Sequence, residues 1–362
     1  MSVFTGFNEK LFLEIQQNSY FCNMITSQIQ TNVDLKAFNT FGISAKAKKF
    51  ATFSSLDELK GLLSERKEEE LLVLGGGSNL LLTQDFDGLV LRNEIKGIET
   101  ISESESDIVL KVGAGEVWHE FVLFCVNNNY AGIENLSLIP GSVGASPMQN
   151  IGAYGVEIKD TFEKLDAFHI ENLELHSFSN SECEFGYRES VFKKGKKGQY
   201  IITHVYFRLS KIAKINSTYG AIETVLEAKG IKNPTIKEIS DAVIEIRTSK
   251  LPDPKLIGNA GSFFKNPVVE KTLFEKIKIN YADTPSYPIN EKCVKIPAGW
   301  LIETAGWKGK SLGNYGVHKN QALVLVNYGG ATGKEIWDLS SDIKKDVYSK
   351  FEIDLEREVN VI

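Results

Sequence analysis

The amino-acid sequence predicts a protein of mixed helices and strands that folds into more than one domain. Its 362 residues exceed the usual size of a single hydrophobic core. Capping sequences at Ser55, Thr235 and Thr332 each precede apolar residues at helical spacing. Residues 162–178 and 200–209 instead alternate apolar and polar side chains, which is typical of strands. We therefore expect helices on both sides of a β-rich middle.

The composition argues against several classes of protein. The chain is 42% apolar and 24% charged, without an apolar run long enough to cross a membrane. A net charge of -6 argues against a general surface for nucleic acid or anionic membranes. The four cysteines and five histidines lack the spacings of disulfide frameworks and metal sites. We expect a cytoplasmic protein without a disulfide or a bound metal, in which any phosphate site is local.

Residues 1–30 form the first predicted segment, a poorly ordered N-terminal extension. They contain neither the basic start nor the sustained apolar run of a signal peptide. Met24 offers a second start position, so the residues before it are expected to be dispensable.

Two glycine-rich segments are candidates for ligand binding. Gly75-Gly-Gly-Ser-Asn79 joins predicted strands over 71–74 and 80–82, and Ile139–Gly155 is poor in charge and rich in small residues. Glycine lets a backbone approach a bulky ligand and turn its N–H groups toward it. Ile139–Gly155 is interpreted as a cradle for a phosphate or a dinucleotide, and Gly75–Asn79 as a tight bend that lets a ligand approach closely. A tight hairpin at the first and a packed connection at the second are the alternatives.

A Rossmann nucleotide site is not expected between these segments. A predicted strand over 108–112 leads through Gly113-Ala-Gly115 into a helix over 116–128, as in a Rossmann motif. Trp118 stands where the third glycine belongs, and no acidic ribose anchor follows a second strand.

Ser262 is the first candidate for proton chemistry. It lies in Gly258–Pro267 between a glycine and two phenylalanines, so we expect a desolvated hydroxyl beside Lys265 and Asn266. Such a hydroxyl either donates a proton or caps a turn. The surrounding sequence is not the GxSxG of serine hydrolases.

Several other segments with charged residues belong either to a binding site or to the solvated surface. Phe185-Gly-Tyr-Arg188 offers an aromatic ring and a guanidinium for packing or for an anion. The lysines that follow, at 193, 194, 196 and 197, are expected in a solvated loop. Leu355–Val359 alternates as a strand does, which places Glu356 and Glu358 on one face, in a site or at a solvated edge. Residues 329–335 resemble a P-loop only superficially and predict a helix start.

Taken in order, the motifs of the chain resemble one family. They are NTFGI (39–43), GGGSN (75–79), IPGSVGASPMQNIGAYG (139–155), FGYRES (185–190), KLPDPK (250–255), GNAGSFFKNP (258–267), PAGWLIE (297–303), QALVLVN (321–327) and LEREV (355–359). This series resembles the UDP-N-acetylenolpyruvoylglucosamine reductases, also called UDP-N-acetylmuramate dehydrogenases, over nearly all of residues 39–359. Pro285-Ser-Tyr-Pro288 is similar to the subgroup in which a tyrosine-bearing loop closes over the substrate.

The resemblance implies an α+β fold with three parts after the extension. They are a two-lobed FAD-binding domain of the vanillyl-alcohol-oxidase/PCMH type over 31–212, a separate α+β substrate-binding domain over 213–352, and a C-terminal strand over 353–362 that returns to the active site. It implies a monomer with non-covalent FAD and NADPH as co-substrate. The small-molecule substrate would be UDP-N-acetylglucosamine enolpyruvate, reduced in bacterial cell-wall precursor synthesis by hydride transfer from NADPH to flavin N5 and on to C3.

The resemblance also assigns site residues. Ser262 matches the proton donor to C2, and Arg188 and Glu358 match the residues that stabilise the developing enolate. The substrate-side matches are Tyr187, Tyr219, Lys250, Asn266, Tyr287 and Gln321. The FAD-side positions are Gly75, Gly76, Gly77, Ser78, Asn79, Pro140, Gly141, Ser142, Gly144, Ala145, Ser146, Gln149, Asn150, Gly152, Ala153, Ile202 and Arg247. The sequence departs from the family at Asn360, where an arginine near the flavin is common.

Two other classes remain as alternatives. An oxidase with a related FAD fold would use O₂ as acceptor and often tether its flavin covalently, so rapid NADPH oxidation with O₂ alone would indicate it. A flavin- or nucleotide-binding module without turnover has no evident need for Arg188, Ser262 and Glu358 together.

Overall fold

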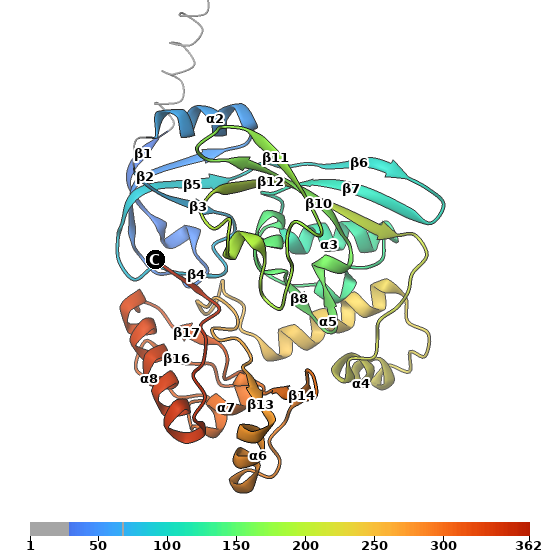
Figure 1. The fold of residues 1–362 in the computed structure, drawn as a ribbon, viewed down its shortest axis with the longest axis vertical. Coiled ribbons are helices and arrows are strands. Elements are labelled where there is room, and N and C mark those ends of the chain that lie inside the picture. Colours follow the sequence, from blue (N-terminus) through green and yellow to red (C-terminus); the bar gives the residue numbers. More distant parts are fainter. Residues whose placement is uncertain (1–28, 67–68) are drawn as a thin grey trace, which may run out of the picture.

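A computed structural model of the protein describes residues 29–66 and 69–362. The expected dispensability of the residues before Met24 lies outside this range. Within it, two larger sheets occupy one half of the molecule and a mixed helical and stranded region occupies the other (Figure 1). The C-terminus lies beside β4, between the two halves (Figure 1).

The first sheet forms the first lobe, with the strand order β1-β2-β5-β3. Its strands are β1 (Gln30–Asp34), β2 (Lys46–Phe53), β5 (Phe86–Asn93) and β3 (Glu70–Leu74). β5 pairs in parallel with both β2 and β3. The predicted helix after Ser55 is confirmed as α2 (Leu56–Glu65), whose first turn is capped by the Ser55 hydroxyl.

The second sheet forms the second lobe and is antiparallel throughout, with the order β11-β10-β12-β7-β6. Its strands are β11 (Leu175–Ser179), β10 (Phe162–His169), β12 (Tyr200–Ser210), β7 (Asp107–Gly113) and β6 (Ile98–Glu103). The strands predicted over 162–178 and 200–209 are thereby confirmed. Helix α3 (Trp118–Asn127) packs Trp118 and Phe121 against Phe207 of this sheet.

Short elements link the longer strands and helices of both lobes. They are the 3-10 helices η1 (Leu35–Phe38), η2 (Glu134–Leu136), η3 (Val143–Ala145), η4 (Pro147–Gln149), η5 (Ile158–Asp160) and η6 (Val191–Lys193), with strands β8 (Gly152–Ala153) and β9 (Val156–Glu157). Within Ile139–Gly155, η3 and η4 are single helical turns, and the N–H groups of Val143 and Gly144 donate to the carbonyls of Glu116 and Ala114 at 2.8 and 2.9 Å.

Helices α4 (Gly220–Ala228) and α5 (Ile236–Lys250) form a pair below the second sheet (Figure 1). The capping box predicted at Thr235 is present. Helix α5 also contacts the second lobe, because its Ser240 hydroxyl lies 2.8 Å from that of Ser137 and Ile236 joins the core of that lobe. The domain boundary at 212/213 stays a prediction.

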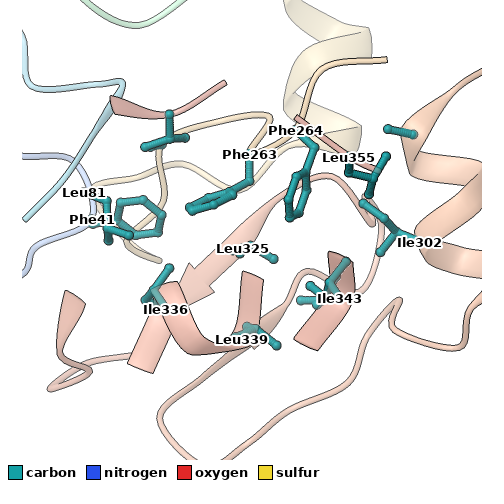
Figure 2. Packing of buried hydrophobic residues seen from close by; sticks show 14 of the residues in the cluster. Phe41, Leu81, Phe263, Phe264, Ile302, Leu325, Ile336, Leu339, Ile343 and Leu355 are labelled. Atoms are coloured by element: carbon teal, nitrogen blue, oxygen red, sulfur yellow. The ribbon is translucent and has the colours of Figure 1, made fainter. Parts of the chain in front are cut away.

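The C-terminal region combines small sheets with three helices. It contains β13 (Val268–Glu270), α6 (Lys271–Asn280), β14 (Tyr287–Pro288), β15 (Cys293–Lys295), α7 (Ala298–Thr304), β16 (Tyr315–Val317), β17 (Leu325–Asn327) and α8 (Gly333–Phe351). Its core continues into the first lobe: Phe41 and Leu81 pack in the same buried cluster as Phe263 and Ile336 (Figure 2). The helix start predicted at 329–335 is confirmed by a capping box between Thr332 and Glu335.

The alternating strand predicted over 355–359 is not formed. Residues 360–361 alone make a strand here, β18 (Asn360–Val361), which pairs in parallel with β4 (Leu80–Leu81). Before it, a single bridge links Arg357 to Phe264. The segment passes between the two halves of the molecule. The burial of each side chain therefore depends on its particular neighbours and not on which face of a sheet it occupies. Accordingly the Glu358 side chain is 12% exposed and that of Glu356 is 69% exposed.

Close packing at the start of α8 leads to a stability prediction. A Cβ atom on Gly333 would overlap the carbonyl oxygen of Leu82, so Gly333→Ala must push α8 away from the first lobe. We expect a loss on the order of 2 kcal/mol in the free energy of unfolding, measured by chemical denaturation. Gly220, also the first residue of a helix, has nothing within 4 Å of its Cβ position. Gly220→Ala should therefore be neutral or stabilising, and equal effects of the two changes would contradict the packing argument.

Candidate active site

The two glycine-rich segments contact each other. A Cβ atom on Gly76 would lie 2.9 Å from the Cα atom of Gly141, and one on Gly75 would overlap the Ser142 hydroxyl. The Ser78 hydroxyl also donates a hydrogen bond of 3.2 Å to the carbonyl of Pro140. The glycines at this contact thus allow two backbones to approach each other, in addition to any ligand.

A cleft of about 440 Å³ opens beside this contact, between both lobes and the C-terminal region. Its wall brings together the three predicted catalytic residues, Arg188, Ser262 and Glu358, from distant parts of the chain. The predicted FAD-side residues that line it are Gly75, Gly76, Gly77, Ser78, Asn79, Pro140, Ser142, Ala145, Ser146, Gln149, Gly152 and Arg247.

Five predicted FAD-side residues do not line this cleft: Gly141, Gly144, Asn150, Ala153 and Ile202. Asn150 is buried with a left-handed φ of 44°, and its side-chain amide donates to the Gly186 carbonyl at 3.1 Å. Ile202 is buried in the core of the second sheet. These two residues therefore have evident packing and hydrogen-bonding tasks, and cofactor binding by all five stays a prediction.

The chemistry of the wall fits a long ligand with a phosphate chain and an apolar ring system. Among the described residues, the backbone N–H groups of Gly76, Gly77 and Ser78 have no hydrogen-bonding partner, although all three residues line the cleft. Unpaired N–H groups on successive residues suit an anion. Trp118 and Met148 add apolar surface nearby. A dinucleotide such as FAD has both of these features.

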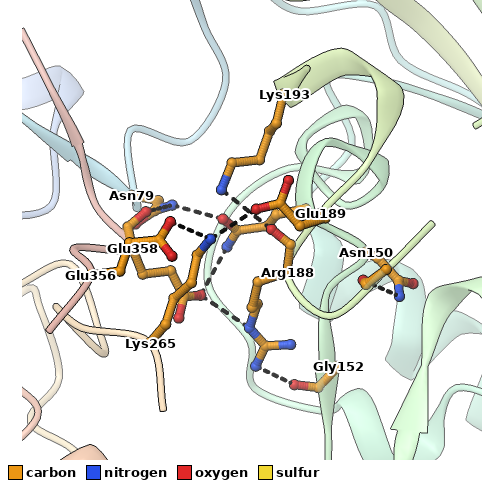
Figure 3. Close-up of polar contacts among 11 residues, drawn as sticks. Asn79, Asn150, Gly152, Arg188, Glu189, Lys193, Lys265, Glu356 and Glu358 are labelled. Carbon is orange, nitrogen blue, oxygen red and sulfur yellow. Dashed lines mark hydrogen bonds and ion pairs between the residues drawn. The ribbon is translucent and has the colours of Figure 1, made fainter. Parts of the chain in front are cut away.

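A hydrogen-bonded chain joins four segments at the floor of the cleft (Figure 3). The Arg188 Nε atom donates to Glu358 Oε1 at 3.0 Å, and its Nη2 atom donates to the Gly152 carbonyl at 2.8 Å. Gln149 donates to the same Glu358 oxygen at 3.2 Å, and Asn79 donates to Gln149 at 3.2 Å. Residues of both glycine-rich segments thus orient the predicted catalytic pair.

Burial controls the electrostatics of this pair. Desolvation raises the pKa of Glu358, and the nearby charges of Arg188, Lys193 and Lys265 act in the opposite direction. Arg188 itself occupies the left-handed region, with φ of 55°. A non-glycine residue rarely adopts this conformation, so its surroundings must hold it there.

Ser262 lies in the cleft, but the prediction of a desolvated hydroxyl beside Lys265 and Asn266 is wrong. Ser262 is exposed, whereas the next two residues, Phe263 and Phe264, turn into the core. Lys265 pairs with glutamates instead, and Asn266 accepts a hydrogen bond of 2.9 Å from the Ala298 N–H at the start of α7. The aromatic pair draws the chain inward and separates these side chains from Ser262.

The predicted substrate-side residues do not line the cleft itself. The Lys295 Nζ atom lies 3.8 Å from the centre of the Tyr187 ring. The Tyr219 ring packs edge-on against the Tyr154 ring, with 5.3 Å between the two ring centres. Tyr287 is exposed in β14 and Lys250 is exposed at the end of α5. Gln321 accepts a hydrogen bond from the Leu323 N–H at 3.3 Å. Substrate binding by these residues and Asn266 stays a prediction.

Lys193 is a site residue that the sequence did not indicate. The expectation of a solvated lysine is wrong here, because Lys193 lines the cleft and donates to the Arg188 carbonyl at 3.3 Å. Burial lowers the pKa of its ammonium group. The run of lysines in the sequence does not show that Lys193, the last residue of the 3-10 helix η6, faces the cleft. Asn360, the position at which the sequence departs from the family that it resembles, donates through its side chain to the Asn79 carbonyl at 3.0 Å.

Several other sequence expectations concern groups outside the cleft. Cys125, Cys183 and Cys293 are free thiols, and Cys22 lies outside the described residues. Over residues 29–66 and 69–362, no group of three His, Cys, Asp or Glu side chains is arranged to hold a metal ion. None of the helices in that range is both long and apolar enough to span a bilayer.

Comparison with known proteins first identifies the class of protein to which the chain belongs. Residues 47–170 match the family model described as an FAD binding domain, so the chain is a flavoprotein. Residues 253–362 match the model described as UDP-N-acetylenolpyruvoylglucosamine reductase, C-terminal domain. The chain is 54% identical to the UDP-N-acetylenolpyruvoylglucosamine reductase of Flavobacterium johnsoniae over 92% of this chain and all (100%) of that one. With the Bacteroides fragilis enzyme it shares 47% identity over 92% and 100% of the two chains.

The chain belongs to the UDP-N-acetylenolpyruvoylglucosamine reductase family, and is therefore an FAD-dependent oxidoreductase. A solved structure of the Thermus caldophilus reductase matches with a TM-score of 0.64 and 25% identity, covering 91% of this chain and 97% of that one. These matches confirm the predicted family, FAD cofactor and α+β fold class with an FAD-binding domain.

The raised pKa of Glu358 gives a prediction for stability against pH. Because folding raises this pKa above 4.5, the group stabilises the folded state fully below pH 4.5, and this contribution is lost as the pH rises. Glu358→Gln removes the titration, so the free energy of unfolding of the variant should improve relative to wild type as the pH rises above 4.5, measured by urea denaturation.

Glu163→Gln supplies a control of opposite sign. Its hydrogen bond with Arg208 lowers the pKa of Glu163, so its contribution is present above pH 4.5 and is lost as the pH falls. The free energy of unfolding of the wild type should therefore increase relative to that of Glu163→Gln as the pH rises. The same trend in both variants would contradict the burial argument for Glu358.

Proposed function

We propose that this chain uses NADPH to reduce the enolpyruvyl ether of UDP-N-acetylglucosamine to UDP-N-acetylmuramate. The observation that supports this proposal is the convergence of Arg188, Glu358 and Ser262 on the cleft lined by both glycine-rich segments. FAD held along these segments would supply hydride transfer, from NADPH to flavin N5 and then to C3 of the enolpyruvyl group. The protein must manage the charge and the proton that this transfer requires.

Arg188 is assigned to the charge that develops at C2 and on its carboxylate. Its Nε and Nη2 groups are held by Glu358 and the Gly152 carbonyl, whereas its Nη1 group has no partner among the described residues. A planar guanidinium fixed on two sides presents its remaining N–H donors in a defined direction. Donors that are oriented before the reaction stabilise a transition state without reorganisation. Glu358 is assigned the task of fixing this guanidinium.

Ser262 is assigned as the donor of the proton to C2. Its hydroxyl is exposed in the cleft, within reach of both a substrate and water. A substrate that covers the Ser262 hydroxyl would exclude water from it. Proton transfer from the hydroxyl to the substrate is then favoured, because the two groups can form a short, direct hydrogen bond. Exchange with water after product release would restore the proton.

We assign the remaining positions to the UDP part of the substrate. Lys250 and Gln321 suit the diphosphate, and Tyr219 and Tyr287 suit stacking or closure. Tyr187 precedes the catalytic arginine in the chain, and Asn266 contacts Tyr187. On this proposal, residues 31–212 bind FAD, residues 213–352 bind substrate, and residues 353–362 return Glu358 to the site.

The function is tested by separating the two half-reactions without oxygen. NADPH should bleach the visible absorbance of the bound flavin, and addition of the enolpyruvyl substrate should restore it, as in a ping-pong cycle. Recovery only after admission of O₂ would indicate an oxidase instead. Absence of bleaching by NADPH would refute the proposed co-substrate.

The assignment of Ser262 predicts a selective defect. Ser262→Ala should lower kcat about 100-fold or more, because a proton donor in the transition state is lost. Flavin reduction by NADPH should keep its wild-type rate, since no proton from Ser262 enters that step. Stopped-flow absorbance measures both half-reactions. Ser64→Ala, which removes an exposed hydroxyl from α2, is the control. Equal slowing of both half-reactions in Ser262→Ala would contradict the assignment.

A further inference from the structure

Lys265 is a buried cation beside the catalytic pair that has no role in the chemistry proposed above. Its side chain is 9% exposed and lies 2.9 Å from Glu189 Oε1 and 2.6 Å from Glu356 Oε1 (Figure 3). The backbone at this point is also paired, since the Lys265 N–H donates to the Glu356 carbonyl at 2.9 Å. Lys265 therefore joins three segments within a few residues of Arg188 and Glu358.

The turn that carries Arg188 needs such an anchor. Gly186 and Glu189 close the turn through a hydrogen bond of 3.0 Å, and Arg188 inside it has φ of 55°. The left-handed conformation is unfavourable for a non-glycine residue, so contacts around the turn must compensate for it. The bond from Lys193 to the Arg188 carbonyl is one such contact, and the ion pair of Lys265 with Glu189 is another.

The charges around Arg188 create a second requirement. Glu189 is the next residue along the chain after Arg188, and Glu356 is two residues from Glu358, so the two segments that carry the catalytic pair each carry a further carboxylate. An unpaired carboxylate beside a guanidinium forms a bidentate pair readily. Lys265 occupies both of these carboxylates, which leaves Glu358 as the carboxylate that accepts from Arg188.

We propose that Lys265 is a positioning residue that keeps Glu189 and Glu356 away from Arg188, so that its guanidinium pairs with Glu358 alone and stays aimed into the cleft. The proposal rests on the proposed function where it concerns catalysis. It concerns the orientation of Arg188 and not the binding of FAD or substrate.

The decisive experiment compares Lys265→Met with the double variant Lys265→Met/Glu189→Gln. The single variant frees Glu189 to compete for Arg188, so kcat and kcat/KM should fall together by roughly 10- to 100-fold, as expected when a catalytic group is displaced. The double variant removes the competitor that follows Arg188 in the chain, whereas Glu356 is 69% exposed and stays solvated, so activity should recover to within about threefold of Glu189→Gln alone. It leaves no unpaired carboxylate in the turn, so it remains informative if the single variant does not fold.

Lys194→Met is the matched control, because Lys194 approaches the other oxygen of Glu189 at 3.7 Å but is 60% exposed. It should retain wild-type kcat. Wild-type activity in Lys265→Met, or a double variant as impaired as the single one, would overturn the proposal. So would a fall in kcat of Lys194→Met equal to that of Lys265→Met.

A readout independent of the reaction separates this proposal from the proposed function. The Nε–H resonance of Arg188 in a ¹⁵N-correlated NMR spectrum, assigned by its loss in Arg188→Lys, should shift and exchange faster in Lys265→Met and return to the wild-type position in the double variant. An unchanged resonance in Lys265→Met would overturn the positioning role. Absence of reductase activity in the wild type, with the resonance responding as expected, would overturn the proposed function alone.

Discussion

The ion pair between Arg188 and Glu358 is the interaction on which the rest of the site depends. It spans 170 residues of sequence and joins the second lobe to the C-terminal segment. Both partners are largely removed from water, so the pair is stable only with the further hydrogen bonds that Gln149 and Gly152 supply. A structure that brings these four groups together has also assembled one wall of the cleft.

The glycine-rich segments support this pair and, on the proposed function, also hold the cofactor. Their mutual contact at Gly76 and Gly141 sets the path of the backbone, and Asn79 and Gln149 extend from it toward Glu358. On the proposed function, the region that holds FAD and the region that holds the catalytic charges thus share residues. Displacement of either segment is expected to disturb both, which explains why ligand binding and chemistry cannot be assigned to separate loops here.

The C-terminal segment is held in place by the core rather than by a regular sheet. Leu355 and Val359 are buried in the apolar cluster that runs from the first lobe into the C-terminal region, and β18 adds one short pairing with β4. Between them, the charged residues of the segment meet Lys265 and Arg188. The hydrophobic anchors therefore determine where Glu358 lies, and the ion pairs determine how it is oriented.

Much of this protein was determined by its sequence alone. The capping sequences at Thr235 and Thr332, the alternating strands and the ordered motifs identified the helices, the fold class and the family, because these are local patterns or fixed series of residues. The sequence did not show that Lys193 turns into the cleft, that Ser262 is exposed, or that Glu356 and Glu358 differ in burial. These outcomes depend on contacts between segments far apart in the chain, such as Lys265 with Glu189 and Glu356, and desolvation by such neighbours exists only once the chain is folded.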